Sequence, residues 1–159
     1  MQPSLLLASG FHVTDEEIYR KNKDDLIRYA SVLVGPSEAE DVVSTVVLRV
    51  LSRRPLEGLE DARAYLFRAV LNESRTRLTR RRPVARIDDF DATPVSDPRP
   101  EVLEAVIGLP VRQRAATFLV YWSDLTIAEA ARLMGTRPGT VKRYMYLAKR
   151  TLRGVLHDD

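Results

Sequence analysis

Apolar residues recur every three or four positions along most of the chain, which is the spacing of an amphipathic helix. In the N-terminal half this pattern predicts three helices, over about residues 14–34, 37–51 and 61–81. Gly35-Pro36 ends the first helix, and a loop with Pro55 and Gly58 precedes the third. The second helix carries a wide apolar stripe of five valines, Val42, Val43, Val46, Val47 and Val50. Because valine is a poor helix former, we expect packing to hold this helix.

The C-terminal half is also predicted to be helical, over about residues 101–107, 111–122, 127–134 and 137–152. Between the halves, residues 83–100 hold four prolines and the acidic run 88–91, with few apolar groups, so we interpret them as a linker. The pattern therefore predicts an all-α chain of two small helical domains joined by a Pro-rich acidic linker. The segments are a tail (1–13), a first domain (14–82), the linker (83–100) and a second domain (101–159).

Three segments have the capping-box pattern, in which a Ser or Thr precedes a Glu by three residues: Thr14–Glu17, Ser37–Glu40 and Thr126–Glu129. We expect each to begin a helix. Gly135 is expected to supply a left-handed turn, and Thr136 to cap the last helix.

The segment 125–153 has the form of a helix-turn-helix. Ala128, Ala131 and Leu133 are expected to pack against the inner side of the second helix, on Val141, Met145, Ala148 and Leu152. Base contacts are expected from the start of its outer face, at Arg137, Thr140, Lys142, Arg143 and Tyr146. Phosphate contacts are expected further along, at Lys149, Arg150 and Arg153. The alternative is an ordinary solvated basic face on a structural helix pair.

The predicted third helix combines aromatic residues, an amide and arginines: Tyr65, Phe67, Arg68, Asn72, Arg75 and Arg77, followed by Arg80–Arg82. Single-stranded DNA is bound by such a combination, because cations follow the phosphates while bases stack or enter pockets. Alternatively, Tyr65 and Phe67 are core residues, and the arginines are a solvated helix end that suits the helix dipole.

Charge is unevenly distributed although the net charge is only +3. Residues 62–86 and 112–159 are basic, whereas residues 1–61 and 87–111 are acidic, so two separate places suit a polyanion. Arginine greatly outnumbers lysine, which suits phosphate and guanine contacts but equally follows from a GC-rich genome.

Several function classes are disfavoured by composition. The chain has no cysteine, and its two histidines, His12 and His157, lie near opposite ends, so we expect no metal site. No phosphate-binding loop or nucleophile motif occurs, so we expect neither a cofactor nor catalytic residues. No apolar run is long enough for membrane insertion.

Together these motifs resemble the bacterial sigma-70 family, and the extracytoplasmic-function (ECF) group within it. The region 4 likeness rests on Leu109–Arg114, Ala128–Gly135, Gly139–Lys142 and Leu147–Arg153. The region 2 likeness rests on Ala39–Val43, on Ala64–Arg68, on Asn72 and on the arginines that follow.

This resemblance implies an alternative sigma factor in the cytoplasm that recruits RNA polymerase core to promoters, without covalent chemistry. Region 2 would dock on the β′ clamp and trap the melted −10 element through Tyr65, Phe67, Arg68, Asn72, Arg75 and Arg77. Region 4 would meet the β flap and read the −35 element. The implied partners are RNA polymerase core, promoter DNA and an anti-sigma factor. Polymerase contacts would come from Asp41, Ser44, Thr45 and Leu48.

The chain departs from the family pattern in the docking helix, where Ser44, Thr45 and Val47 replace the usual Gln, acidic and aromatic residues. Arg143, Tyr144 and Tyr146 are unusual in the recognition helix, so the family's promoter sequence does not transfer. These departures leave two alternatives open: a sigma-like decoy that binds an anti-sigma factor without supporting transcription, and a stand-alone helix-turn-helix regulator.

Overall fold

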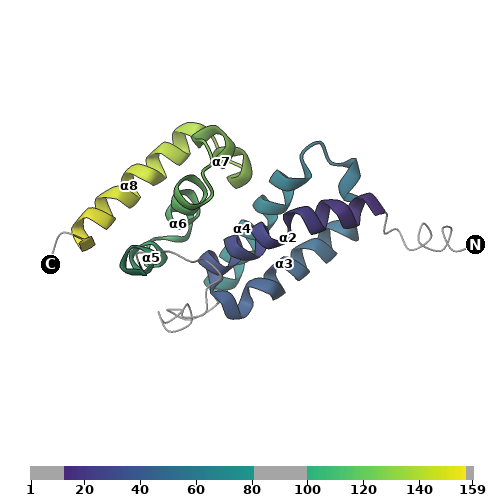
Figure 1. The fold of residues 1–159 in the computed structure, drawn as a ribbon, viewed down its shortest axis with the longest axis horizontal. Coiled ribbons are helices and arrows are strands. Elements are labelled where there is room, and N and C mark those ends of the chain that lie inside the picture. Colours follow the sequence, from purple (N-terminus) through teal and green to yellow (C-terminus); the bar gives the residue numbers. More distant parts are fainter. Residues whose placement is uncertain (1–12, 81–99, 157–159) are drawn as a thin grey trace, which may run out of the picture.

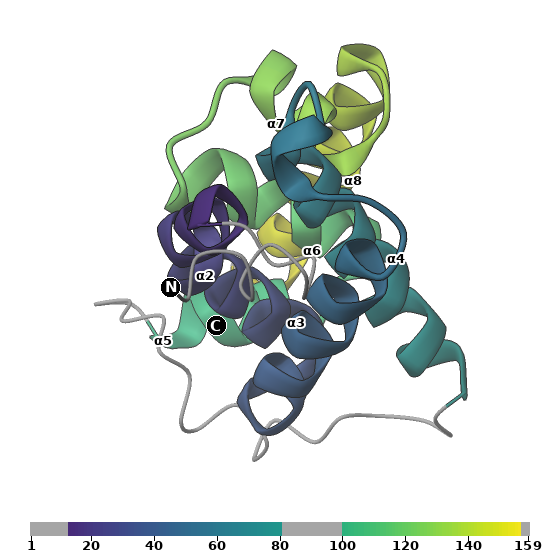
Figure 2. The ribbon, with the colours of Figure 1, turned by 90° about the vertical axis from the view of Figure 1, so that its right-hand side faces the viewer.

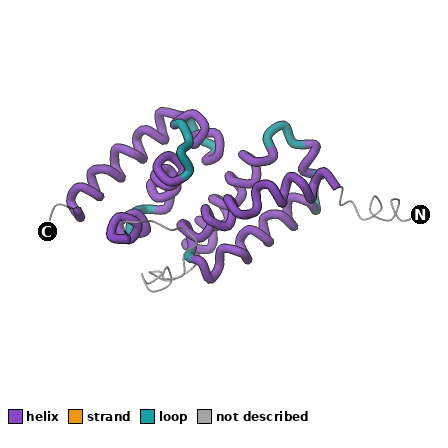
Figure 3. Tube along the Cα trace, viewed as in Figure 1, coloured by secondary structure: helices purple, strands orange, loops and turns teal. Residues whose placement is uncertain are grey.

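The computed structural model describes residues 13–80 and 100–156 (Figure 1). All regular structure in these two ranges is helical, which confirms the predicted all-α class (Figure 3). The first half contains α2 (Val13–Val34), α3 (Pro36–Leu51), a 3-10 turn (Leu56–Gly58) and α4 (Ala62–Arg80). The second half contains α5 (Pro100–Ile107), α6 (Val111–Thr117), a π-helical turn (Phe118–Trp122), α7 (Ile127–Met134) and α8 (Pro138–Leu156). The predicted tail and linker lie outside the described residues, except that Val13 begins α2 and Pro100 begins α5.

Two of the three predicted capping boxes are wrong. Helix α2 already includes Val13, and α3 begins at Pro36 after Gly35, so Thr14 and Ser37 lie inside helices. The third box is confirmed: the Thr126 hydroxyl accepts from the Glu129 N–H at 3.1 Å, and the Glu129 carboxylate accepts from the Thr126 N–H at 2.8 Å. Gly135 takes the predicted left-handed conformation, with φ of 68°. Helix α8 begins at Pro138, so Thr136 precedes the capping position.

The predicted continuous helix over 111–122 changes character at its end. From Phe118 the chain widens into a π-helical turn, in which the Ser123 N–H donates to the Phe118 carbonyl at 3.1 Å. Asp124 then adopts a left-handed φ of 53°. These two features end the helix that begins at Val111 and lead the chain into α7.

The five valines of α3 are all buried, as their spacing predicts. They pack against α2 and α4 in a three-helix arrangement. Figure 2 views the molecule from the side on which these three helices lie. In the second half, Val141, Met145 and Ala148 of α8 are buried. Ala128 is exposed and Ala130 is buried in its place, because α7 turns this face toward α4.

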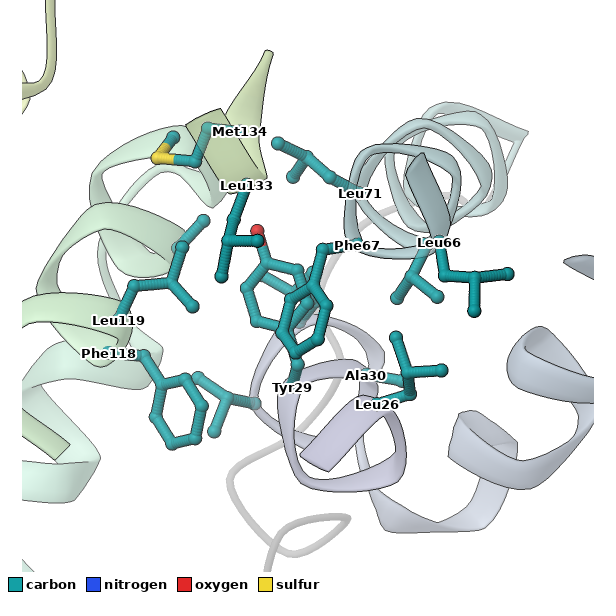
Figure 4. Packing of buried hydrophobic residues seen from close by; sticks show 14 of the residues in the cluster. Leu26, Tyr29, Ala30, Leu66, Phe67, Leu71, Phe118, Leu119, Leu133 and Met134 are labelled. Carbon is teal, nitrogen blue, oxygen red and sulfur yellow. The ribbon is translucent and has the colours of Figure 1, made fainter. Parts of the chain in front are cut away.

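The two halves share one hydrophobic core. The Tyr29 ring of α2 lies 5.0 Å from Phe67 of α4 and 6.2 Å from Phe118 of the second half, measured between ring centroids. Leu133 and Met134 of α7 approach the same cluster (Figure 4). The structure thus adds extensive packing between the halves to the predicted pair of helical regions.

Candidate nucleic-acid interface

The outer face of α8 carries the residues predicted to read duplex DNA. Thr140 is partly exposed, and the other members of the set are exposed: Arg137, Lys142, Arg143, Tyr146, Lys149 and Arg150. Tyr146 exposes 62% of its surface, which is unusual for a large aromatic residue. Across the described part of the chain, none of the five cationic side chains in this set has an ion-pair partner. They are therefore available to phosphates and base edges.

The turn before α8 is fixed by local chemistry. The Thr126 capping box begins α7, and Gly135 ends it in a conformation that favours glycine. A Cβ atom at Gly135 would also lie only 3.1 Å from the Arg68 side chain of α4. The turn therefore holds the start of α8 and meets the first half at the same point.

A pocket of about 270 Å³ lies between α3 and α4. It has apolar walls from Val46, Val50 and Ala69, and its other lining residues are Arg49, Arg53, Tyr65, Arg68 and Asn72. Tyr65, Arg68 and Asn72 were predicted to contact single-stranded DNA, and the structure brings them together here. An apolar wall beside an aromatic ring, an amide and cations suits an unstacked base and its phosphate.

Arg49 and Arg53 of this pocket were missed by sequence reasoning. Arg49 lies in the last turn of α3 and Arg53 in the turn that follows the helix, and both are exposed. Two cations four residues apart at a helix end could have signalled a phosphate contact. A second groove of about 420 Å³ continues along α4, lined by Asn72, Arg75, Thr76, Thr79 and Arg80.

Phe67 is a correction to the predicted DNA-contacting set. Its ring is only 2% exposed, it packs on Tyr29, and the Arg63 guanidinium lies 4.8 Å from its centroid. The alternative assignment of Phe67 to the core is the one that the structure supports, because this face of α4 meets α2.

Arg77 is the second correction. Its guanidinium donates to Asp41 of α3 at 2.6 Å, to the Thr45 hydroxyl at 3.2 Å and to Glu73 at 3.1 Å. Arg49 donates to the same Glu73 carboxylate at 3.2 Å. Burial tends to raise the pKa of Glu73, but hydrogen bonds from Arg77 and Arg49 outweigh it and leave the pKa below its usual value. We call these five residues the α3–α4 clasp; it holds Arg77 away from solvent.

The four predicted polymerase contacts lie along one face of α3. Leu48 is 70% exposed and Ser44 is exposed, so both can meet a partner. Asp41 and Thr45 belong to the clasp through Arg77. Thr45, which stands where the family usually has an acidic residue, therefore has an internal hydrogen bond that accounts for it structurally.

The halves meet at polar contacts as well as in the core. Arg68 Nε donates to the Arg132 carbonyl at 2.8 Å, and Arg132 pairs with Asp61 at 2.9 Å. Arg114 of α6 donates to the carbonyls of Val32 and Leu33 at the end of α2, at 3.2 and 2.8 Å, and to Leu109 in its own half. We call this set, with Tyr29, the junction.

In the two described ranges, no group of three or more His, Cys, Asp or Glu side chains is arranged to hold a metal ion. Over the same ranges, no helix combines the length and the apolar character needed to cross a membrane.

Two known family models match this chain, one in each half. Residues 18–84 match the model of sigma-70 region 2, and residues 99–152 match sigma-70 region 4. The chain is 31% identical to the ECF RNA polymerase sigma factor SigM of Mycobacterium tuberculosis, over 93% of this chain and 80% of that protein. It is 32% identical to the ECF sigma factor BldN of Streptomyces coelicolor over 89% of its length, but spans only 60% of BldN.

The fold also resembles that of the sigma factor RpoE of Bartonella quintana, solved in complex with the anti-sigma factor NepR. The TM-score is 0.69 at 21% identity, covering 91% of this chain and 97% of that one. The likeness in structure extends over both halves, and the family models and relatives agree with it. The chain belongs to the sigma-70 family, in the group of ECF RNA polymerase sigma factors.

Proposed function

We propose that this chain directs RNA polymerase core to specific promoters as an alternative sigma factor. The observation that carries the proposal is the outer face of α8. Five cations on this face have no ion-pair partner in the described ranges, and an exposed tyrosine lies among them. A helix of this kind enters the major groove with its N-terminal residues on base edges. Arg137, Thr140, Lys142, Arg143 and Tyr146 would read the −35 element, and Lys149 and Arg150 would contact its phosphates.

The −10 element would be bound on α4. The pocket between α3 and α4 would accept an unstacked base against Tyr65, with Arg68 and Asn72 at its opening, and Arg75 would follow the strand along the adjoining groove. Arg49 and Arg53 join this proposed surface. Phe67 and Arg77 leave it, because both side chains are engaged inside the first half.

Polymerase and an anti-sigma factor are the proposed protein partners, and the cytoplasm the proposed location. Leu48 and Ser44 would form the accessible part of a contact with the β′ clamp, and region 4 would meet the β flap. RpoE of Bartonella quintana was crystallised with an anti-sigma factor, which supports a partner of that kind here. Recognition and melting would proceed without covalent chemistry by this chain.

Promoter binding would require the halves to separate. Elements centred 25 positions apart lie about 85 Å from one another along duplex DNA. A compact chain of this length has a radius of gyration of only about 15 Å. Because α4 and α7 share one core, this closed arrangement cannot span both elements.

The test is binding to purified bacterial core polymerase, followed by run-off transcription from a genomic fragment library. We expect a stable complex and discrete start sites. Replacing Lys142 and Arg143 with alanine should abolish initiation at −35-dependent promoters. The matched control replaces Lys23 and Arg28, two exposed cations of α2 far from α8 in sequence, and should leave initiation intact. Equal transcript levels from both double variants would contradict the assignment of α8.

A sigma-like decoy is the second candidate, and the α3–α4 clasp favours it. Asp41 and Thr45 are engaged by Arg77, which reduces the docking face to Ser44 and Leu48. A decoy would bind an anti-sigma factor but neither core polymerase nor promoters. A stable complex with core polymerase that supports run-off transcription would exclude this candidate.

A further inference from the structure

A separate pocket of about 260 Å³ lies where α4 meets the helix-turn-helix. Both halves line it: Leu71, Asn72 and Arg75 come from α4, and Arg112, Met134, Gly135, Thr136 and Tyr144 come from the second half. Leu71 and Met134 are buried and approach one another from the two halves (Figure 4). The pocket therefore exists only while the halves are packed together.

The charged residues that line this pocket are all positive. Arg75 and Arg112 are the only charged residues among those that line it, and no carboxylate faces them from the lining. In the part of the chain that the structure describes, neither guanidinium has an ion-pair or hydrogen-bond partner. Two unpaired cations brought to one pocket by the packing of two halves repel each other, and a bound anion would relieve that repulsion.

The other polar groups narrow the class of anion. Guanidinium groups match the geometry of phosphate, and Thr136 adds a hydroxyl. The Asn72 amide can recognise a base edge, and the Tyr144 ring offers a surface for stacking. The volume falls just below the usual range for small-molecule pockets, which limits the occupant to about one phosphate and one ring system.

We propose that this pocket binds a small phosphorylated ligand of mononucleotide size, which holds the two halves together. A ligand that binds the closed form and not the open form stabilises the closed form by mass action. The regulatory consequence rests on the proposed function, because Asn72 and Arg75 also belong to the proposed −10 surface. Occupancy would then keep both residues from promoter DNA and lower initiation.

Binding is tested by calorimetry on the full chain, at fixed ionic strength, with 5′-AMP, inorganic phosphate and a six-nucleotide single strand as separate probes. We expect one saturable site for 5′-AMP, weaker binding of phosphate, and competition between the two. Arg112→Ala should weaken 5′-AMP binding about tenfold or more, as loss of a charge-assisted contact does. The matched control Arg28→Ala, an exposed arginine of α2, should leave the affinity unchanged.

Four results would overturn the proposal. They are the absence of saturable 5′-AMP binding at millimolar concentrations, equal losses in Arg112→Ala and Arg28→Ala, loss in Arg75→Ala without loss in Arg112→Ala, and binding of the single strand alone. The third would assign the site to α4 by itself, and the fourth to a DNA strand. Arg112→Lys, which keeps the charge but not the fork, should give an intermediate affinity and guards against a folding defect.

A second experiment separates this proposal from the proposed sigma activity. 5′-AMP should reduce run-off transcription by the natural chain, and Arg112→Ala should escape the reduction. If the chain supports no transcription, the proposed function fails while the calorimetric result stands on its own. If transcription is supported and 5′-AMP reduces it equally in both chains, the ligand acts elsewhere and the pocket is not its site.

Discussion

The α3–α4 clasp and the junction between the halves are both built on arginines that join helices, and the partners of these arginines differ. In the α3–α4 clasp, Arg77 and Arg49 donate to carboxylates, those of Asp41 and Glu73. At the junction between the halves, the acceptors of Arg114 and Arg68 within residues 13–80 and 100–156 are all backbone carbonyls. Among the residues that the structure describes, the ion pair across the junction is Arg132–Asp61, which is largely exposed to water and so contributes little.

This difference indicates which of the two sets of contacts, the clasp or the junction, stays formed when the protein binds a promoter. A carboxylate neutralises the charge that it binds, whereas carbonyls leave the charge uncompensated, and burial lowers the pKa of Arg114 to about 10. The buried Tyr29 hydroxyl at the junction has no hydrogen-bond partner among the described residues, and burial raises its pKa. Both groups would regain water if the halves separated. We infer that the clasp is a fixed part of the first half and that the junction is built to open.

Arg114→Ala should have the largest effect on this comparison. It removes the donor for carbonyls of Val32, Leu33 and Leu109 and leaves them unpaired away from bulk water. We expect a loss of about 3 kcal/mol in the free energy of unfolding, measured in urea. Arg114→Met should lose less, because it fills the same space. A loss below about 1 kcal/mol in Arg114→Ala would show that the junction does not depend on this side chain.

Arg77→Ala should destabilise the first half by about 2 kcal/mol, since Asp41 and Glu73 would lose their shared partner. Arg77→Lys keeps the charge but not the fork, and should recover about half of the loss. Urea unfolding measures both. A double-mutant cycle with Asp41→Asn should give a coupling energy; if the two losses simply add, the clasp is not a unit.

Tyr29→Phe should raise the free energy of unfolding by about 1 kcal/mol. The ring contacts with Phe67 and Phe118 stay, and only the unpaired hydroxyl is removed. Tyr121→Phe is the matched control, because Tyr121 is already 52% exposed in the folded chain. Destabilisation by Tyr29→Phe would mean that the hydroxyl stabilises the folded chain, and it would contradict the inference that the junction is built to open.

Lowering the pH should weaken the α3–α4 clasp, and we expect this effect to be the smallest of the four predicted here. The pKa of Glu73 is lower in the folded chain than its ordinary value of 4.5. Its contribution is therefore complete above about 4.5 and is lost as pH falls through the lowered pKa. The free energy of unfolding, followed from pH 6 to 3, should fall less steeply in Glu73→Gln than in the natural chain. Parallel curves would remove Glu73 from the acid response.

The helices themselves were predictable from sequence, because each depends on neighbours within about four residues. The prediction over 61–81 became Ala62–Arg80, and the prediction over 127–134 became Ile127–Met134. Helix starts were harder to predict, since the Ser/Thr-to-Glu pattern occurs inside helices as readily as at their ends. Asp15, inside the first predicted box, instead accepts hydrogen bonds from the Leu56 and Glu57 N–H groups across the bundle.

The exposed face of the candidate interface was predictable where exposure follows from helix periodicity. The outer face of α8 is set by Val141, Met145 and Ala148, whose burial turns the basic residues outward. On α4 the same reasoning was insufficient, because that helix has neighbours on more than one side. Phe67 faces α2 and Arg77 faces α3, and neither relation is encoded in the spacing along α4.

The sequence by itself determined the helices, the helix-turn-helix, the basic outer face of α8 and the family. Each of these depends on residues close together in the chain or on a motif that can be read along it. Only the tertiary structure decided that Arg77 joins Asp41 at a separation of 36 residues and that Arg114 reaches Leu33 at a separation of 81. It also decided that the halves close on one core and form a pocket between them. Such contacts depend on how whole helices pack, because many weak apolar contacts together select the helix faces that meet.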